Sequence, residues 1–277
     1  HFLKNESTRS NNYFSIGARI NGSPAGLALC EILSKETTEL KSLFVTQKHR
    51  EKGLASKILK KAENEAKKQG CTTVLVLYLD NMGGKILEKL LKTGGYSPPE
   101  FSSLVCSSKR RGKILNAPFL KKSLLPPSCE TFLWKDLKPQ ERNFILDKQQ
   151  QTPWYPSILS PFRNEKEIEF LNSLGLRYRG EIAGWIITHR ISHKTIRYTT
   201  SFVRQDLQQY GFTAPLLIEA IKIHIASPES YVATDASFVI PVQFESMITL
   251  AKKRILPYME ESWNLYKSYK ELSNKDR

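Results

Sequence analysis

Leu40-Lys-Ser-Leu-Phe-Val45, followed by Thr46-Gln-Lys-His-Arg50-Glu-Lys-Gly53-Leu-Ala55 and a basic amphipathic helix, is the stretch that decides the fold of this 277-residue chain. Its order is strand, loop and helix start. Unpaired amides and the helix dipole both favour negative charge at a helix N-terminus, so such a loop can hold phosphate. Gly53 permits close approach of the main chain, Ala55 leaves the helix start uncrowded, and Arg50 adds a cation. We therefore predict a pyrophosphate cradle over residues 50–56.

The spacing Arg50-x-x-Gly53-x-Ala55, with Gly53 eight residues after Val45, resembles the acyl-CoA pyrophosphate signature of the GNAT superfamily of N-acyltransferases. An apolar, β-branched run over 71–78 follows as a strand. Asn81 then opens a helix that ends at Gly94-Gly95-Tyr96, and this succession is similar to the next two elements of the family. The alternative is a generic strand, turn and helix in which the glycine serves only the turn.

The same signature returns later in the chain. Gly211 lies eight residues after Val203, and Gln208-x-x-Gly211-x-Thr213 superimposes on the first signature with an offset of 158 residues (211 − 53). Thr213 replaces the small residue of the motif, and Pro215 lies in the first helical turn, where its missing N–H is tolerated. An internal repeat predicts two units of one fold. The resemblance therefore implies an α/β (α+β) tandem GNAT protein, each domain a mixed, mostly antiparallel sheet flanked by helices.

Proline pairs at 98–99 and 126–127 and the basic cluster over 109–113 punctuate the middle of the chain. They divide it into a first domain at 1–108, a connection at 109–128 and a second domain at 129–277. In the first domain, alternation around Asn21-Gly22 predicts a hairpin of strands 13–20 and 24–33, followed by a strand over 38–45. In the second domain we predict helices over 139–149 and 165–174 and strands over 130–136, 176–179, 181–190 and 195–203.

One departure from the family concerns the beginning of the chain. A strand and two helices normally precede the hairpin, and only about a dozen residues stand before Tyr13. Either residues are missing there or the first domain is a reduced one. Because those two helices usually shape the acceptor site, the second domain, in which both are predicted, is expected to supply that wall.

The net charge of +15 is unevenly placed, because residues 1–127 carry 22 Lys and Arg against 10 Asp and Glu. Such a positive field attracts polyphosphate cofactors, an acidic acyl carrier protein, nucleic acid or anionic lipid. The excess of Lys and Arg is equally explained by helix faces that are exposed to solvent. The cluster over 109–113 lacks interleaved aromatics, which disfavours single-strand binding. The four dispersed cysteines predict reduced thiols in an intracellular protein. No apolar run is long enough to span a membrane.

Acyl transfer to an amine needs a base, because an alkyl ammonium has no lone pair with which to attack. Glu39 lies on the strand before the loop, where the histone acetyltransferases of the superfamily carry their general-base Glu, and it is our catalytic candidate. The competing interpretation is a surface carboxylate that pairs with Lys41 or Lys35. The resemblance also implies an oxyanion donor at the backbone N–H of Phe44 or Val45.

The usual general acid of the family is a Tyr in the helix before the Gly-aromatic pair, and Leu91 stands at that position. This weakens the case for catalysis in the first domain. Substitutes that the sequence does not rank are Tyr78, Tyr96, Tyr198 and Tyr258.

The remaining candidates complete the predicted sites. The donor-binding set is Phe44, Val45, Arg50, Lys52, Gly53, Leu54, Ala55, Ser56 and Asn81, with Val203, Gln208, Gly211 and Thr213 as its counterpart in the second domain. Trp154 and Tyr155, in a loop rich in proline and aromatics, are expected to bind the acceptor. His189 and His193 lack a third ligand, so we expect no metal.

The sequence therefore predicts a cytoplasmic N-acyltransferase. It would use acyl-CoA, as acetyl-CoA or a longer thioester, or an acyl carrier protein, and would act on an amine of a small molecule, peptide or protein. The alternative is a tandem module that senses CoA or binds nucleic acid without catalysis, with nucleic acid as the less favoured partner. Attachment to an anionic membrane is supported only by the positive net charge.

Overall fold

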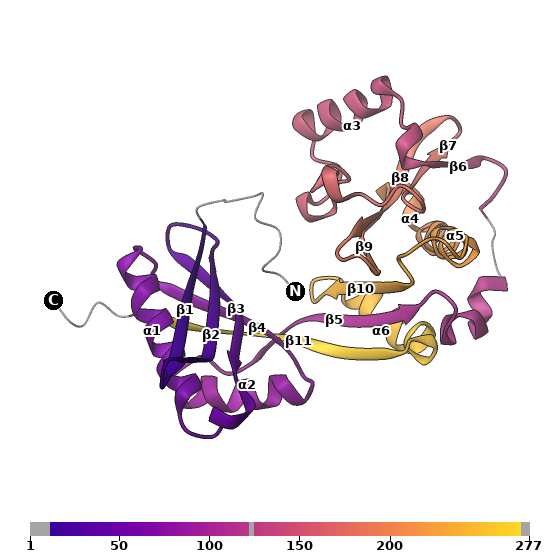
Figure 1. The fold of residues 1–277 in the computed structure, drawn as a ribbon. Helices are drawn as coiled ribbons and strands as arrows, with labels where there is room; N and C mark the ends of the chain where they lie inside the picture. Colours follow the sequence, from indigo (N-terminus) through magenta and orange to yellow (C-terminus); the bar gives the residue numbers. More distant parts are fainter. Residues whose placement is uncertain (1–11, 122–124, 273–277) are drawn as a thin grey trace. The chain divides into compact units, whose positions relative to one another are not determined.

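The computed structural model describes residues 12–121 and 125–272. The chain forms two compact units (Figure 1). Unit 1 comprises the described residues up to Ser103 together with those from Trp263 onward, and unit 2 comprises the described residues from Leu104 to Ser262. Each unit has a mixed, mostly antiparallel sheet with helices, so the predicted fold class is confirmed.

Unit 1 is built on five strands in the order β1-β2-β3-β4-β11. The β3–β4 pair is parallel and the other neighbours are antiparallel. Asn21 and Gly22 make the hairpin turn with φ of 50° and 77°, as their dipeptide predicts. The elements are β1 (Tyr13–Ile20), β2 (Ser23–Ile32), β3 (Thr37–Val45), α1 (Leu54–Lys68), β4 (Thr73–Leu79), α2 (Met82–Thr93) and the unit 1 part of β11 (Glu261–Glu271).

Unit 2 repeats this arrangement in the strand order β5-β10-β9-β8-β7-β6, again with a parallel pair, β9–β10. Its strands are β5 (Glu100–Lys109, which begins in unit 1), β6 (Cys129–Leu133), β7 (Leu174–Tyr178), β8 (Glu181–Arg190), β9 (Thr195–Val203) and β10 (Asp235–Pro241). Its helices are α3 (Pro139–Gln151), α4 (Gln205–Gln208), α5 (Thr213–Ala226) and α6 (Glu245–Arg254). None of the helices in the described part of the chain is long and apolar enough to cross a membrane.

Each unit has its own hydrophobic core. In unit 1 the apolar side of α1, with Ile58, Leu59, Ala62 and Ala66, packs with inward-facing residues of β2, β3 and β4. In unit 2 one cluster gathers residues of β7, β8, β9, β10 and α5, and a second, aromatic cluster lies around Trp185 and Phe202. The cores are separate clusters, so the two units are each able to bury an apolar interior of their own.

The repeat with the offset of 158 residues extends well beyond the signature. Gly26 and Gly184 are equivalent positions at which an added Cβ would meet the carbonyl oxygens of Phe44, at 2.9 Å, and Phe202, at 2.5 Å. The β2–β3 pair and the β8–β9 pair each contain a β-bulge, in which one residue has no partner on the neighbouring strand. The bulge residues, Lys41 in β3 and Thr199 in β9, are also equivalent. The two units therefore share glycines, β-bulges and strand register, which a chance similarity of two loops would not produce.

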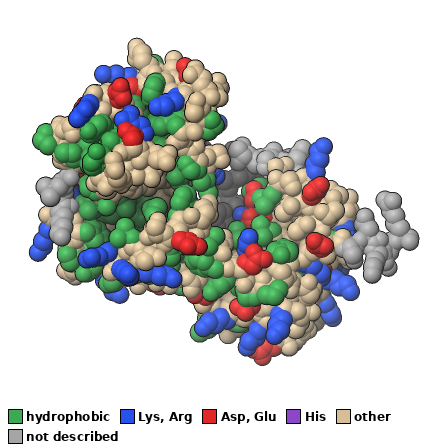
Figure 2. All heavy atoms as spheres, turned by 180° about the vertical axis from the view of Figure 1, so that it is seen from behind, with side chains coloured by type: hydrophobic (Ala, Val, Ile, Leu, Met, Phe, Trp, Pro, Cys, Tyr) green, Lys and Arg blue, Asp and Glu red, His purple; other side chains and the backbone are tan. Residues whose placement is uncertain are grey.

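The unit boundaries differ from the boundaries predicted at 108 and 129. β11 returns to unit 1, where it pairs with β4 from Leu265 opposite Leu79 to Glu271 opposite Thr73. The segment predicted as a connection contributes Ile114 and Ala117 to the unit 2 core. When the full sequence is divided at these boundaries, residues 1–103 and 263–277 have a net charge of +8 (20 − 12) and residues 104–262 have a net charge of +7 (22 − 15). Figure 2 shows basic side chains scattered among acidic ones on one face.

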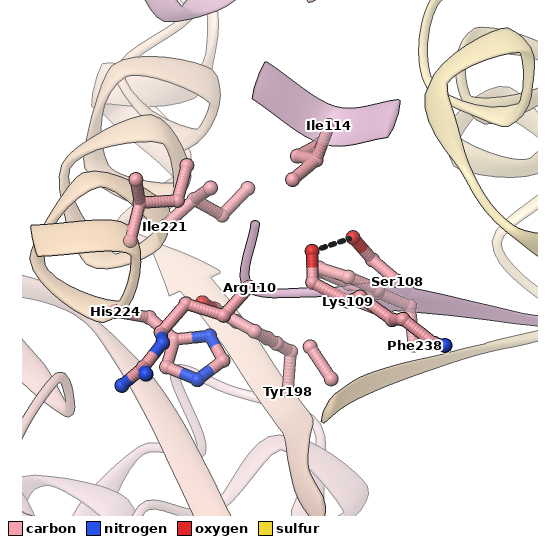
Figure 3. Close-up of a pocket in the computed structure, with 10 residues that line it drawn as sticks. Ser108, Lys109, Arg110, Ile114, Tyr198, Ile221, His224 and Phe238 are labelled. Atoms are coloured by element: carbon pink, nitrogen blue, oxygen red, sulfur yellow. Dashed lines mark hydrogen bonds between the residues drawn. The ribbon is translucent and has the colours of Figure 1, made fainter. Parts of the chain in front are cut away.

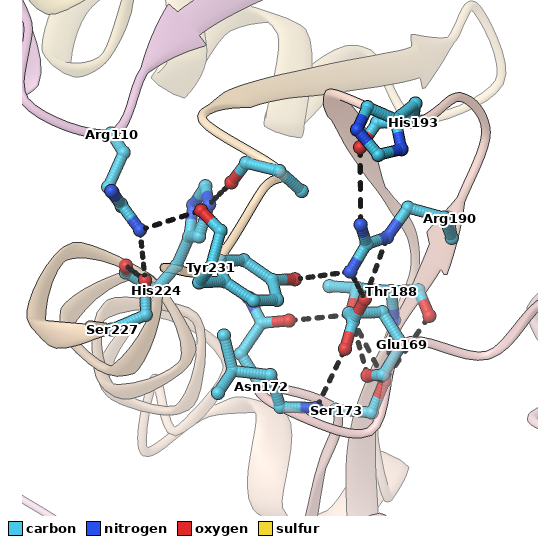
Figure 4. A network of polar contacts seen from close by, with 12 residues as sticks. Arg110, Glu169, Asn172, Ser173, Thr188, Arg190, His193, His224, Ser227 and Tyr231 are labelled. Atoms are coloured by element: carbon cyan, nitrogen blue, oxygen red, sulfur yellow. Dashed lines mark hydrogen bonds and ion pairs between the residues drawn. The ribbon is translucent and has the colours of Figure 1, made fainter. Parts of the chain in front are cut away.

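The predicted helix over 165–174 is wrong. Only Glu165–Glu167 forms a single 3-10 turn, and the chain then extends along β8, with Ile168 bridged to His189 and the Glu169 N–H bonded to the Thr188 carbonyl. Asn172 and Ser173 hydrogen bond to Thr188, as the network in Figure 4 shows. Residues 170–172 form a turn, and the Ser173 hydroxyl donates to the Glu169 carbonyl within it. Tertiary contacts therefore override the helical pattern of this segment.

Candidate functional site

The two parallel strands of unit 1 separate just before the predicted cradle. β3 pairs with β4 from Thr37 opposite Thr73 to Leu40 opposite Val76, and their pairing stops there although both strands continue. The β4-facing edge of β3 beyond Leu40 is thus free of β4 at the segment that contains Phe44 and Val45. Unpaired backbone N–H groups on such an edge are suited to bind a carbonyl oxygen.

The loop after β3 is held in shape by its own side chains. Arg50 donates from Nε to the Val45 carbonyl at 3.1 Å, and Lys52 donates from Nζ to the Lys48 carbonyl at 3.1 Å. Gly53 has φ of 72°, a left-handed conformation that residues with a Cβ adopt with strain. Arg50 is therefore a strand-end cap as well as a cation, a role that its place in the motif alone does not reveal.

The start of α1 presents the backbone groups that a phosphate needs. The first helical bond of α1 runs from the Lys57 N–H to the Gly53 carbonyl at 3.2 Å, so the N–H groups of Leu54, Ala55 and Ser56 precede the helical ladder. Residues 47–56 carry three Lys and Arg and one Glu. The structure thus brings six of the predicted donor-binding residues into one loop: Arg50, Lys52, Gly53, Leu54, Ala55 and Ser56.

Two predicted donor-binding residues have other structural surroundings. The Asn81 Oδ1 atom accepts a hydrogen bond from the Gly84 N–H at 2.9 Å and caps α2, so this side chain is already engaged. Phe44 is 51% exposed on β3. Its side chain adds an apolar surface beside the predicted oxyanion donor.

Glu39 belongs to a charged cluster on the β2–β3 pair. It is only 8% exposed, and the Lys41 Nζ lies 3.0 Å from it and 3.4 Å from Glu31. Tyr13 donates its hydroxyl to Glu31 at 2.6 Å. Burial lowers the pKa of Lys41, but the hydrogen bond and charge of Glu39 outweigh this and raise it. The pairing with Lys41 matches the competing interpretation of Glu39, while its burial and its place beside the parting strands suit a base.

Sequence reasoning named Lys41 as an alternative partner of Glu39 and did not single out Glu31. The signal was available, since the hairpin turn at Asn21-Gly22 fixes the register that places Tyr13 opposite Glu31. The face of the sheet on which Lys41 lies could not be predicted, because Lys41 is the extra residue of a β-bulge.

Three of the four tyrosines proposed as general acids are engaged in the interior. Tyr96 donates to the buried Glu63 at 3.1 Å, and burial raises the pKa of its phenol. Tyr78 lies 3.4 Å from the Ser268 hydroxyl, and Tyr198 accepts from Asn172 at 3.0 Å. Leu91 is buried at 1% exposure. These phenols have structural partners, so none of the three stands out as a proton donor.

The equivalent loop of unit 2 has the same backbone frame with a weaker anion site. Gln208 donates to the Val203 carbonyl at 3.0 Å, as Arg50 does to Val45, and Gly211 has φ of 71°. Pro215 replaces Lys57 and has no N–H, and the Ala214 N–H is directed at the Gly211 carbonyl. Residues 205–214 carry one Asp and no Lys or Arg. Thr213 begins α5 in this less favourable setting.

The two aromatic residues predicted to bind an acceptor are packed in unit 2. Tyr155 is 6% exposed, and its ring centroid lies 5.1 Å from that of Trp185. Trp154 packs against Phe202 at 5.4 Å. This packing gives both a structural role, and their role in substrate binding stays a prediction.

Unit 2 also contains a small pocket, shown in Figure 3, between β5, α5 and the β9–β10 pair. Arg110 and His224 line it together with Tyr198 and Phe238, whose rings stack at 4.4 Å. His224 donates from Nε2 to the Ala233 carbonyl, and burial lowers its pKa. The pocket lies away from the loop of residues 205–214, and it collects none of the predicted donor-binding residues.

The two histidines considered as metal ligands do not form such a site. His189 hydrogen bonds to Thr199 and to the Arg163 carbonyl, both at 2.8 Å. Within residues 12–121 and 125–272, no group of three metal-ligating side chains comes together.

Comparison with known proteins agrees with this geometry. Residues 2–84 match the acetyltransferase (GNAT) family model. None of the curated proteins compared with the chain matches it.

Several solved structures share the fold over almost the whole chain. A tandem GNAT protein from the clavulanic acid biosynthesis pathway, without acetyl-CoA, is 12% identical with a TM-score of 0.63 over 95% of this chain and 84% of that protein. A GCN5-related N-acetyltransferase from Sphaerobacter thermophilus is 14% identical with a TM-score of 0.62 over 91% and 78%. One from Kribbella flavida is 11% identical with a TM-score of 0.53 over 92% and 88%. Residues 2–84 thus match the acetyltransferase (GNAT) family model, and the chain as a whole has the fold of a tandem GNAT protein.

Proposed function

We propose that unit 1 binds the pyrophosphate of an acyl-CoA at residues 50–56 and transfers the acyl group to an amine. The observation that carries this proposal is the loop itself. Three backbone N–H groups at the start of α1 stand beside Lys48, Arg50 and Lys52, and directly after the point where β3 and β4 part. Amides, a helix dipole and cations together favour a polyphosphate.

The loop of unit 2 supports the assignment by contrast. Arg204, next to it, is already paired with Asp206 at 2.8 Å and Glu181 at 3.3 Å. The loop of unit 2 has no Lys or Arg in residues 205–214, and Pro215 in the helix start has no N–H. This loop therefore offers a phosphate fewer hydrogen-bond and charge partners than the loop of unit 1. We therefore assign the donor to unit 1.

The acceptor would approach the cluster of Glu31, Glu39 and Lys41. The cluster has two carboxylates and one ammonium, so its net negative charge attracts a protonated amine. The amine can take the place of the Lys41 ammonium beside the carboxylates. Glu39 would take the proton, directly or through water. The amine nitrogen then bonds to the thioester carbon, the C–S bond breaks, and the CoA thiolate leaves and takes up a proton.

A second candidate is a module that binds acyl-CoA without turnover. Leu91, in the position of the usual acid, and the ion pair of Glu39 with Lys41 favour it. It shares the donor site with the first candidate and differs only in turnover.

Melting temperatures in the presence of CoA, acetyl-CoA and longer acyl-CoAs test donor binding, since only a bound donor stabilises the folded chain. At 100 times Kd we expect a rise of roughly 5 °C. Release of free thiol with a panel of amines then separates enzyme from sensor. No rise with any thioester would contradict both candidates.

A further inference from the structure

The charged cluster around Glu39 has a counterpart of opposite charge in unit 2. The offset of 158 residues relates Glu31, Glu39 and Lys41 to His189, Arg197 and Thr199. In both units the middle residue directly precedes the last residue of the parallel strand pair, Leu40 or Tyr198, and the third residue is the bulge. A carboxylate in unit 1 is thus replaced by a guanidinium in the same place of the fold.

Arg197 has no counter-ion among the described residues. Its Nε atom is enclosed and has no hydrogen-bond partner, and none of the described carboxylates forms an ion pair with its guanidinium. Asp235 is near in register, since its backbone pairs with Thr195, but it does not pair with Arg197. Burial is the cause that lowers the pKa of Arg197, with no compensating carboxylate. A partly buried cation in this state lacks the anion that would offset its desolvation.

Thr200 provides a second unpartnered group on the same side of β9. It is 3% exposed, and its Oγ1 has no hydrogen-bond partner. Thr200 pairs with Ile187 and Arg197 pairs with His189, so both residues lie on the face of β9 shared with Phe202. With the bulge residue between them, the two are about two strand steps, or ~7 Å, apart. Both unpartnered atoms, the Arg197 Nε and the Thr200 Oγ1, are enclosed, so a ligand that bonds to them has to enter between the side chains of this face.

Arg110 has a buried, unpartnered Nε atom like that of Arg197, but another nitrogen of its guanidinium is hydrogen bonded. Its Nη1 donates to Ser227, to the Pro228 carbonyl and to the Tyr231 carbonyl, as drawn in part in Figure 4. Arg110 thereby ties β5 to the end of α5 and needs no ligand. Arg197 makes none of these bonds.

We propose that the β9 face of unit 2 around Arg197 and Thr200 binds the carboxylate of a small molecule. The planar guanidinium matches a carboxylate in two parallel N–H···O bonds, and the Thr200 hydroxyl donates a third. One guanidinium and one hydroxyl suit a carboxylate better than a phosphate dianion. This site is independent of donor binding in unit 1, and it stands if residues 50–56 prove to bind no thioester.

The test follows the Arg197 Nε–Hε resonance by NMR in the full chain without CoA, with the assignment made by Arg197→Lys. Acetate is titrated at constant ionic strength, with the neutral isostere acetamide and with inorganic phosphate as separate probes. We expect saturable shifts with acetate, no shift with acetamide and weaker binding of phosphate.

Thr200→Val should weaken acetate binding by roughly threefold to tenfold, the loss of one hydrogen bond to a charged group. Ser42→Ala, the equivalent change in unit 1, should leave it unchanged. Equal shifts with acetate and acetamide, tighter binding of phosphate than of acetate, or unaltered acetate affinity in folded Thr200→Val would each overturn the proposal.

Discussion

At the scale of single residues, one position separates the two units most clearly. Glu39 is a buried carboxylate beside a lysine, and Arg197, at the equivalent position, is a guanidinium without a carboxylate. A base is needed where an ammonium must lose its proton, and a guanidinium cannot act as one at neutral pH. Only unit 1 therefore has a base at this position of the fold.

Glu39→Gln is predicted to lower kcat by roughly 100-fold or more, because the amide keeps the shape and loses the basicity. Donor affinity should remain within about twofold, since Glu39 is not part of the loop of residues 50–56. Turnover with an active amine, together with donor binding by calorimetry, measures both effects. Glu31→Gln removes the other carboxylate of the cluster, one strand further from the parted strands, and should raise KM for the amine while kcat changes far less. Unchanged turnover in Glu39→Gln would move the base elsewhere.

A second residue-scale prediction concerns the stability of unit 2. The hydrogen bonds of Arg177, at 2.6 Å and 3.0 Å, lower the pKa of Glu141 below its usual 4.5. A carboxyl whose folded pKa is depressed stabilises the fold above its unfolded pKa, and this contribution is lost as pH falls through the folded value. Glu141→Gln should therefore cost about 2 kcal/mol of unfolding free energy at pH 7 and progressively less below pH 4.5. Urea unfolding of the wild type and of Glu141→Gln, at pH 7 and at a pH below 4.5, measures this loss of unfolding free energy. An equal loss at the two pH values would contradict the prediction.

At the scale of elements, the sequence predicts strands well where a local signal sets them. The Asn21-Gly22 turn fixes the first hairpin, β8 follows from a continuous apolar run, and β9 follows from its alternation. The helix predicted over 165–174 fails because the side chains of Asn172 and Ser173 pair that segment with β8. Such partners lie more than ten residues away, so no local pattern reveals them.

β11 is the element whose place the sequence predicts least. It follows unit 2 in the chain and completes the sheet of unit 1 by pairing with β4. Deleting residues 263–277 is predicted to expose the β4 edge, so amide exchange of Val74, Val76 and Tyr78 should speed up by at least tenfold. Exchange within β8 should change far less, since β8 keeps both of its neighbours. Equal acceleration in β4 and β8 would show that the strand stabilises both units alike.

At the scale of the whole molecule, the chain carries one backbone frame twice with different chemistry on each copy. The frame comprises the parting parallel strands, the bulge and the left-handed glycine, and the sequence predicts its period because Gly53 and Gly211 keep the same spacing. The division of roles could not be predicted in the same way. It depends on the ion pair of Glu39 with Lys41 and on the lack of a counter-ion for Arg197 among the described residues, which only the folded structure shows.

The central claim is that the donor binds to unit 1, and paired glycine variants test it most directly. Gly53→Ala and Gly211→Ala place a Cβ on equivalent backbones with φ of 72° and 71° and with no neighbour within 4 Å, so each should lose a similar ~1 kcal/mol of stability. Calorimetric titration with acetyl-CoA should show at least tenfold weaker binding for Gly53→Ala and wild-type affinity for Gly211→Ala. Weakened binding in Gly211→Ala with wild-type affinity in Gly53→Ala would contradict the account.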